Sequence, residues 1–350
     1  MNAEAGKPDK QQRPLRRRIV RILRWIGIVV MILAVLGVVY QSMMSAADRR
    51  NYPPAGEVID MGGYDLHLLC EGTGSPTVVL IPGAGDIAQI WEPVQNIVQG
   101  DTRVCSYDRP GLGWSDFAPD GEQTIASQMT ILHDLLEAAD EEGPYIVVGH
   151  SIGGVMARTF ATAYPDETVG VVLVDSSIEG QFSVLPSQIG ESNQNAGLIF
   201  TFCRFVSPFG IPRLLGLGTA RANAFDLLSE DAQAAIAATF HQTRGCAALQ
   251  RDGAVADDVL YTGEPAESLG DIPLIVITRG LAEQDVDPGV RYSSGMITTF
   301  TETQEIWLEI QADLLELSTN SRQIIAEESG HYVHTTQPQL VAEAIQSLIE

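Results

Sequence analysis

One stretch of sequence decides the fold: YIVVGHSIGGVMARTFATAY, residues 145–164. Its first apolar residues, Tyr145–Val148, predict a short buried strand, and the apolar spacing over Val155–Tyr164 predicts a helix. The turn between them has the pattern Gly-x-Ser-x-Gly, in which a strained central serine needs neighbours without side chains two positions away. We therefore expect Ser151 to project above the end of a strand, where a nucleophile would stand.

The same alternation of short apolar runs and helical patterns extends along most of the chain. Apolar β-type runs predict strands at residues 58–61, 64–70, 77–81, 103–107, 145–148, 169–174, 273–278 and 323–326. Helical spacing predicts helices at 124–138, 155–164, 305–317 and 338–349. Fully apolar strands separated by helices are typical of a parallel sheet covered on both faces. The predicted fold class is α/β, with a mostly parallel eight-stranded sheet.

Residues 178–270 interrupt this alternation with helical pieces and no good strand, the clearest helix being 227–249. We expect a helical cap inserted after the sixth strand, over the carboxyl edge of a core formed by residues 57–177 and 271–350. The cap sequence is rich in large apolar side chains, which either line an apolar acyl pocket or form the cap's own core. They are Phe200, Phe202, Phe205, Phe209, Leu214, Leu215 and Leu217.

The N-terminal segment predicts a membrane helix. Residues 1–24 are strongly basic, and residues 25–44 are long and apolar enough to span a bilayer. The positive-inside rule places the basic flank in the cytoplasm and the remainder of the chain across the membrane. The alternative is a signal peptide cleaved near the small residues Ser45–Ala47, which would release the protein. Residues 45–56, with Pro53 and Pro54, are expected to be a linker.

The charge of the chain is strongly uneven. The net charge is −24, but residues 1–24 hold eight basic and two acidic residues. The remainder therefore has 13 basic and 43 acidic residues, a net charge of −30. Such a surface repels nucleic acid and anionic membranes, so both are poor partners for the folded part, and no nucleic acid is expected as a partner.

Three motifs together resemble the α/β-hydrolase family over roughly residues 56–350. They are the turn at Ser151, the loop Ile81-Pro82-Gly83-Ala84-Gly85, and the loop from Asp108 to Ser115 with the pattern D-x-x-G-x-G-x-S. Within the family the chain is similar to membrane-anchored bacterial serine hydrolases. The backbone N–H of Ile152, at the start of the helix, faces the place where an oxyanion would form. The resemblance implies that Ala84 supplies the second N–H, although proline stands where the family usually has histidine.

The resemblance also implies a base and an acid. His331, in Ser329-Gly330-His331 after the last predicted strand, matches the family's base. His334 is its nearest competitor, and we expect it to be a loop or surface histidine. The orienting acid has two candidate positions. Asp175 directly follows the sixth strand, whereas Glu283, Asp285 and Asp287 lie in the loop after the seventh. Asp175 is the first choice, then Asp285, then Glu283.

The four cysteines allow two disulfides if the domain is exported. In the family's strand order the strands of Cys70 and Cys105 are neighbours, so a bond between them is reasonable. Cys203 and Cys246 both lie in the insertion and could join parts of the cap. Four buried thiols are the alternative. The spacing of cysteines and histidines indicates no metal site, and no cofactor is expected.

These observations predict a serine hydrolase that cleaves an ester, or a related acyl bond, of a small or lipid-like substrate through an acyl-enzyme. Two alternatives remain open. An acyltransferase would use the same residues with another acceptor. A non-catalytic binding protein could keep the fold without the chemistry.

Overall fold

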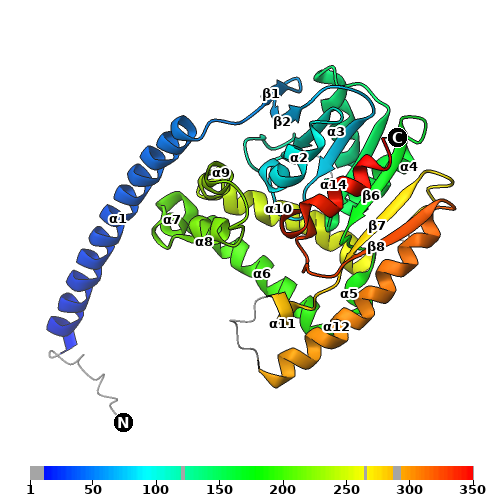
Figure 1. Cartoon of the computed structure of the whole chain (residues 1–350). Helices are drawn as coiled ribbons and strands as arrows, with labels where there is room; N and C mark the ends of the chain where they lie inside the picture. Colours follow the sequence, from blue (N-terminus) through cyan, green and yellow to red (C-terminus); the bar gives the residue numbers. More distant parts are fainter. Residues whose placement is uncertain (1–11, 120–122, 264–265, 287–292, 350) are drawn as a thin grey trace, which may run out of the picture.

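A mostly parallel sheet of eight strands runs through the folded body, as Figure 1 shows for this computed structural model. The structure describes all residues except 1–11, 120–122, 264–265, 287–292 and 350. The strand order is β1-β2-β4-β3-β5-β6-β7-β8, in which β1–β2 and β2–β4 are antiparallel and the other pairs are parallel. The strands are β1 Glu57–Asp60, β2 Asp65–Glu71, β3 Thr77–Ile81, β4 Val104–Tyr107, β5 Tyr145–His150, β6 Thr168–Val174, β7 Leu274–Arg279 and β8 Ser321–Ala326.

Helices cover both faces of this sheet. One face packs on α3 and α4, and the other packs on α2 and α14. Those four are α2 Glu92–Val98, α3 Ile125–Ala138, α4 Ile152–Ala163 and α14 Pro338–Gln346. The remaining helices of the core are η1 Ala88–Trp91, α11 Glu283–Val286, α12 Ser294–Asp313, η3 Leu314–Leu317 and α13 Val333–Thr336. The predicted α/β class is confirmed.

The strands are buried on both sides, which explains their unbroken apolar sequences. In β3, Val79 and Ile81 join the core on the α3 and α4 side, while Val78 and Leu80 join the core on the opposite side. Successive side chains of a strand point to opposite faces, so a strand between two helix layers needs apolar residues at every position.

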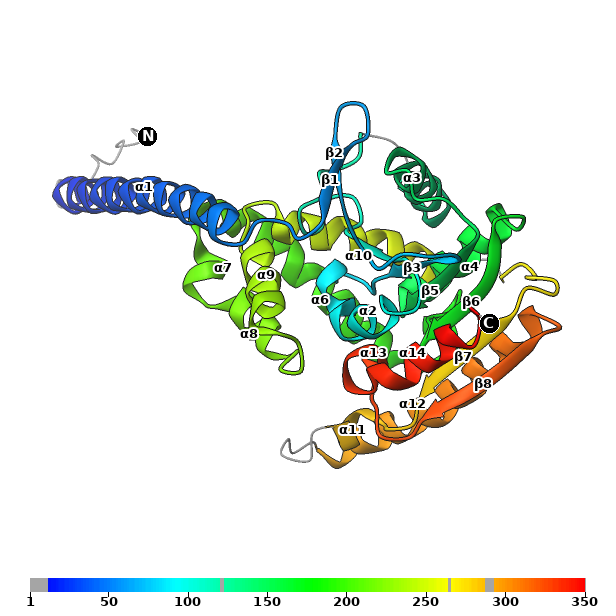
Figure 2. The same ribbon diagram turned by 45° about the horizontal axis from the view of Figure 1, so that its top comes forward.

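The segment between β6 and β7 is helical throughout its described elements. It contains α5 Gln181–Val184, α6 Ser187–Val206, η2 Ser207–Phe209, α7 Ile211–Leu214, α8 Leu217–Asn223, α9 Glu230–Phe240 and α10 Gly245–Thr262. Figures 1 and 2 show α7, α8 and α9 on the side of the body that faces the N-terminal helix. We call residues 178–270 the cap below.

The expected single helix at 227–249 is wrong, because the chain forms α9 and α10 there instead. Ser229 caps the start of α9 by accepting a hydrogen bond from the N–H of Ala232 (3.1 Å). The break after α9 follows from a tight turn: a Cβ on Gly245 would lie 2.3 Å from the carbonyl oxygen of Phe240. Apolar spacing alone does not mark a turn as short as the one between Phe240 and Gly245.

The N-terminal helix α1 spans Gln12–Asn51, so the expected linker at 45–56 is wrong over its first seven residues. Tertiary contacts hold this extension in helical form. The Arg213 guanidinium pairs with Asp48 (2.6 Å), and Gln41 donates to the carbonyl oxygen of His241 (2.7 Å). Only residues 52–56, which include Pro53 and Pro54, separate the helix from β1.

Among the described residues α1 is the one helix long and apolar enough to cross a membrane. Its apolar window is not buried against the rest of the protein, and Figures 1 and 2 show the helix projecting from the body. A core helix of a soluble protein would instead be buried. Its length and exposure fit a membrane-spanning helix, and an N-terminal signal sequence has the same two properties.

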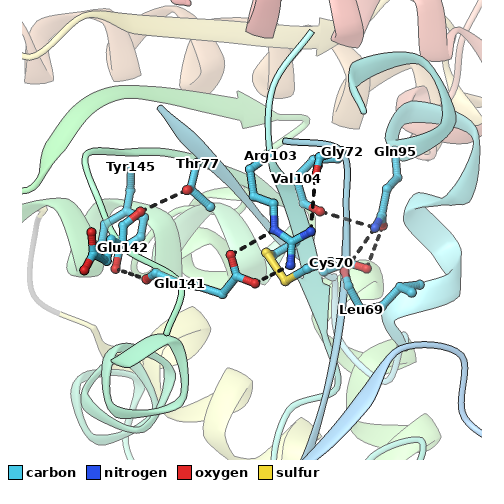
Figure 3. Close-up of a disulfide and its surroundings, with 12 residues drawn as sticks. Leu69, Cys70, Gly72, Thr77, Gln95, Arg103, Val104, Glu141, Glu142 and Tyr145 are labelled. Carbon is cyan, nitrogen blue, oxygen red and sulfur yellow. Dashed lines mark hydrogen bonds and ion pairs between the residues drawn. A yellow bond between two sulfur atoms is a disulfide. The ribbon is translucent and has the colours of Figure 1, made fainter. Parts of the chain in front are cut away.

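Two disulfides are present, Cys70–Cys105 and Cys203–Cys246. The first joins β2 to β4, where the two cysteines are directly paired in the sheet. Figure 3 shows Cys70 beside the ion pair of Arg103 and Glu141, in which Nε of Arg103 donates to the carboxylate over 3.0 Å. The second joins α6 to α10 within the cap.

Candidate active site

Ser151 stands at a strained turn between β5 and α4. Its backbone angles are φ 54° and ψ −124°, a region that a residue with a side chain rarely adopts. Two close approaches hold it there. A Cβ on Gly149 would lie 2.0 Å from the carbonyl oxygen of Gly153, and a Cβ on Gly153 would lie 2.4 Å from that of Ile81. Neither position can carry a side chain, which accounts for the Gly-x-Ser-x-Gly pattern.

The backbone ties this turn to the end of β6. The N–H of Ser151 donates to the carbonyl oxygen of Val174 (3.2 Å), and the N–H of Ser177 donates to that of Ser151 (3.0 Å). Asp175 lies between these two contacts, also with a positive φ, 43°. Parallel strands end at the same edge of a sheet, so Ser151 and Asp175 lie side by side at the carboxyl edge.

Asp175 is fully buried and accepts hydrogen bonds from every side. Nδ1 of His331 lies 2.6 Å from Oδ2, while Nε1 of Trp307 donates to Oδ1 over 2.7 Å. Arg279 reaches both oxygens, through its backbone N–H and its guanidinium, each at 3.1 Å. Burial alone would raise the pKa of Asp175, but Arg279, His331 and Trp307 outweigh burial and hold the pKa below its usual value. The carboxylate is therefore ionised beside His331.

The alternative acids lie elsewhere. Glu283 and Asp285 are exposed on α11, and Asp287 is outside the described residues. Asp175 is the one carboxylate hydrogen-bonded to His331 among the side chains that the structure describes. A buried carboxylate needs partners in the protein, whereas an exposed one is satisfied by water.

His331 packs on His150, which packs on His334 in turn, and the expectation that His334 is a surface residue is wrong. His334 is fully buried at the start of α13, with its ring 4.4 Å from that of Trp91 and 4.3 Å from that of His150. His150 in turn lies 4.5 Å from the ring of His331, and its Nε2 is 3.0 Å from the His331 carbonyl oxygen. His334 thus contacts His150, and His150 in turn contacts the loop that carries His331.

Burial keeps both supporting histidines neutral. It lowers the pKa of His334 to about 3, with the His331 charge adding to the effect, and it lowers the pKa of His150 well below the usual value. Because both neighbours are neutral, neither would repel a positive charge that forms on His331 during a proton transfer.

The loop proposed to bear the second oxyanion donor is held by Arg109, which is buried. Its guanidinium donates to the carbonyl oxygens of Pro82 and of Gly83 (2.7 Å for Gly83). It also forms a bidentate pair with Asp252 of α10, at 2.8 and 2.9 Å. Asp252 in turn accepts a hydrogen bond from the N–H of Gly85 (2.7 Å). None of these hydrogen bonds involves the N–H of Ala84, and Ala84 itself is exposed.

A second arginine joins the same loop to the cap. Arg221 of α8 donates to the carbonyl oxygen of Gly85 (2.9 Å) and to Oδ1 of Asp86 (2.6 Å). Burial raises the pKa of Asp86 despite the opposing charges of Arg221 and Arg109. Two cap helices, α8 and α10, thus contact the loop of residues 82–86 directly, and we call this loop the proposed oxyanion loop. These contacts escaped sequence analysis because partners more than 130 residues apart leave no local pattern.

An apolar cavity opens beside this loop, between the cap and the core. Gly85 and Asp86 form part of its wall. Most of the remaining lining is apolar and comes from η1, the 111–113 loop and α8–α10: Ile87, Ile90, Leu112, Phe225, Ile236, Phe240, Ala248 and Leu249. Arg221 and Arg244 also line the cavity, so this lining suits a hydrocarbon group that carries a polar or anionic end.

The loop from Asp108 to Ser115 acts as a structural tie. The Asp108 carboxylate accepts hydrogen bonds from the N–H groups of Ala88 (2.8 Å) and Trp114 (2.9 Å) and pairs with Nδ1 of buried His67 (2.8 Å). Burial opposes protonation of His67, but Asp108 outweighs it and raises the histidine pKa. This second histidine–aspartate pair lies away from Ser151, and sequence analysis missed it.

Two clusters of described residues have the donor types of a metal site, but one of them consists of Glu141 and the cysteines of the Cys70–Cys105 disulfide. In the other, His133, Asp134 and Glu137 on α3 bring their donor atoms within 4.8 Å of one another. His133 is already engaged, because its Nε2 contacts Glu167 (3.1 Å) and its ring stacks on Tyr164. This cluster is on a helix that covers the sheet, remote from the carboxyl edge.

Comparison with curated proteins identifies relatives over part or most of the chain. A Gibberella zeae protein described as an AB hydrolase superfamily protein is 25% identical over 283 residues, 79% of this chain and 86% of its own. An uncharacterized Schizosaccharomyces pombe protein is 38% identical over 124 residues, 35% of this chain. The match covers only 22% of the yeast protein's length.

Comparison with solved structures identifies the same fold. An esterase from Thermogutta terrifontis superposes with a TM-score of 0.54 at 19% identity, covering 84% of this chain and 99% of its own. An epoxide hydrolase from Acinetobacter nosocomialis gives a TM-score of 0.62 at 14% identity, covering 89% and 97%. The sequence model of the alpha/beta hydrolase family matches residues 78–344. With its strand order, its serine turn and this match, the chain belongs to the α/β-hydrolase family.

Proposed function

We propose that the protein is a serine hydrolase that cleaves a carboxylic ester through an acyl-enzyme. The observation that carries the proposal is the 2.6 Å contact between Nδ1 of His331 and Asp175, beside the strained turn of Ser151. A carboxylate on Nδ1 fixes the tautomer in which Nε2 can accept a proton. His331 would then deprotonate Ser151, and Ser151 would attack the ester carbonyl.

The backbone would stabilise the oxyanion that this attack creates. The first N–H groups of a helix have no partner within the helix, and Ile152 begins α4 directly after Ser151. The N–H of Ile152 and that of Ala84 are the proposed donors. His331 would next protonate the leaving alcohol and activate the water that releases the acid.

The apolar cavity supports an ester with a hydrocarbon acyl chain. Its lining is largely aliphatic and aromatic, and it adjoins the loop that carries Ala84. A serine at the turn argues against the epoxide-hydrolase branch of the fold, which uses an aspartate there.

We further propose that α1 anchors the enzyme in a membrane, with the basic flank in the cytoplasm and the catalytic domain on the other side. The length and exposure of α1 support an anchor, and the basic residues before its apolar run support this orientation.

Labelling with a fluorophosphonate ester probe tests the proposed chemistry. The wild-type protein should become covalently modified, and Ser151→Ala should not. His331→Ala should lose nearly all labelling, because an unactivated serine reacts slowly. An unlabelled wild type would overturn the proposal in favour of a non-catalytic binding protein. Equal labelling of Ser151→Ala would instead show that another residue is the nucleophile, and it would overturn the assignment of Ser151. Product analysis with an added alcohol separates hydrolysis from acyl transfer.

A further inference from the structure

The cap carries an apolar surface that its own packing leaves uncovered. The large apolar side chains of α6 and α7 were expected to line a pocket or fill the cap's core. Most of them instead point to solvent, and Phe202 and Leu215 are each 68% exposed. We call the following six residues the apolar patch: Leu198, Ile199, Phe202, Phe205, Leu214 and Leu215. Clusters of this kind mark interaction sites far more often than chance exposure.

The charge around the apolar patch is unlike that of the rest of the chain. Acidic residues make up 45 of the 350 residues, about one in eight, yet residues 192–225 contain none. The same stretch holds three arginines, Arg204, Arg213 and Arg221. Two of these arginines are neutralised by ion pairs, Arg213 with Asp48 and Arg221 with Asp86. The apolar face therefore lies in a stretch without acidic residues, which suits a phospholipid surface better than the acidic remainder of the domain does, because carboxylates would be repelled by the phosphate groups.

The position of α1 fixes the depth of this surface. A Cβ on Gly37 would lie 2.7 Å from the carbonyl oxygen of Phe209, so α1 and η2 are in direct contact there. Gly37 lies within the uncharged run Trp25–Tyr40, three residues before its end. At 1.5 Å per residue, that contact is about 5 Å inside the apolar run.

The polar contacts between α1 and the cap lie beyond the end of the apolar run, where a helix leaves the hydrocarbon region of a bilayer. Gln41 donates to the His241 carbonyl oxygen, and Asp48 pairs with Arg213, both beyond the end of the apolar run. Tyr40, whose ring lies against Gly210, has the position of an interfacial aromatic residue. The contact between α1 and the cap thus passes from apolar to polar along the helix.

The apolar patch is also rigidly mounted. Cys203 lies between Phe202 and Arg204 on α6 and is bonded to Cys246 of α10, the helix that carries Asp252. The patch is therefore covalently linked to the helix that contacts the proposed oxyanion loop.

We infer that the apolar patch is a second membrane-binding surface, which seats the cap in the leaflet that α1 enters or leaves. The inference rests on the proposed anchoring by α1, and it does not depend on the chemistry at Ser151. The cap would lie at the boundary between head groups and acyl chains, where amphipathic surfaces bind a bilayer without crossing it.

Spin labels on the full chain in phosphatidylcholine vesicles test this inference. Single cysteines would replace Phe202 and Leu215 in the apolar patch, Leu33 in α1, and Ile325 on β8. Ile325 is an exposed apolar residue of β8, a strand that lies away from α1 in both Figure 1 and Figure 2. Collisions with oxygen report lipid, and collisions with a water-soluble nickel complex report solvent.

The labels at 202 and 215 should collide with oxygen and be shielded from nickel, as the label at 33 is, while the label at 325 should be open to nickel. The patch is labelled at two positions so that the test can still be read if one of the two variants fails to fold. If nickel reached the labels at both patch positions but not the label at 33, membrane binding by the apolar patch would be wrong, and anchoring by α1 would still be supported. Nickel access at Leu33 would instead overturn the anchor itself. Patch labels shielded from both reagents, with spin–spin broadening, would mean contact with a second copy of the chain and would also overturn the inference.

Discussion

The sheet and the cap reach a stable structure by different routes. Every residue of β5, from Tyr145 to His150, is buried, and close backbone contacts specify the turn that follows. The cap instead combines long helices, α6 and α10, with short ones, and a large share of its apolar side chains are exposed. One side of the cap packs apolar residues on the core, and long-range polar contacts and one disulfide add to this packing. The structure of the sheet therefore depends mainly on its local sequence, whereas the position of the cap depends on contacts with residues far away in the chain.

The largest expected effect concerns the acid at the sheet edge. Asp175→Asn should lower kcat by roughly 10⁴, because an amide would favour the wrong tautomer of His331. The matched control is Asp285→Asn, which changes an exposed carboxylate on α11 and should leave kcat unchanged. Steady-state hydrolysis of a soluble ester would measure both. A large loss in Asp285→Asn instead would move the acid from the sheet to the loop.

Glycine substitutions compare the two regions directly. Gly149→Ala should destabilise the protein by about 4 kcal/mol or prevent folding, since its Cβ would lie 2.0 Å from the Gly153 carbonyl oxygen. Gly197→Ala, within α6 of the cap, meets nothing within 4 Å. It should stabilise that helix by about 1 kcal/mol. Denaturant unfolding of both variants measures the contrast, and equal destabilisation would refute it.

The contact between the two regions can be broken at Asp252. Asp252→Asn leaves the buried guanidinium of Arg109 without its counter-charge and should cost about 3 kcal/mol. The variant should also lose kcat, because Arg109 and Asp252 both hold the proposed oxyanion loop. Asp258→Asn, an exposed site on the same helix, is the control. A variant that lost stability but kept full kcat would show that the loop does not need the cap.

The smallest expected effect is a pH dependence of stability from His334 and His150. Both have a folded-state pKa below the usual 6.5, so the unfolded chain takes up protons first as the pH falls. Stability should be full above pH 6.5 and decline below it by about 1.4 kcal/mol per pH unit for each histidine. For His334 the decline continues toward pH 3.

Unfolding free energies between pH 6.5 and 5 measure this slope. His334→Gln should make the slope shallower, whatever the substitution does to stability at neutral pH. His67 has a raised pKa, so its contribution is present below pH 6.5 and is lost as the pH rises through that raised value. An unchanged slope in His334→Gln would contradict the prediction.

The sequence allowed the sheet to be predicted closely, because strands buried on both faces must be apolar throughout. The expected runs match β3 and fall within one or two residues of most other strands. The expected helix at 305–317 was less accurate, since α12 begins at Ser294 and ends at Asp313. A half-exposed helix has a weaker pattern than a buried strand.

Long-range contacts account for what the sequence could not supply. The choice between Asp175 and the acids of α11 depended on which carboxylate is enclosed by Trp307 and Arg279, and these residues lie over 100 positions away. The burial of His334 likewise depended on Trp91. The exposure of Phe202 and Leu215 could not be predicted, because it depends on how the described helices pack around α6 and α7.

The continuity of α1 has a consequence for maturation. Proteolytic release after Ala47 would remove Gln41 and Ser45, both of which are buried against the cap. The shortened chain would lose the side-chain amide that engages His241 and Arg213, and it would leave the carbonyl oxygen of His241 with one donor fewer. Cleavage would therefore do more than release the protein from the proposed anchor. It would also remove contacts that hold the cap, which covers the cavity.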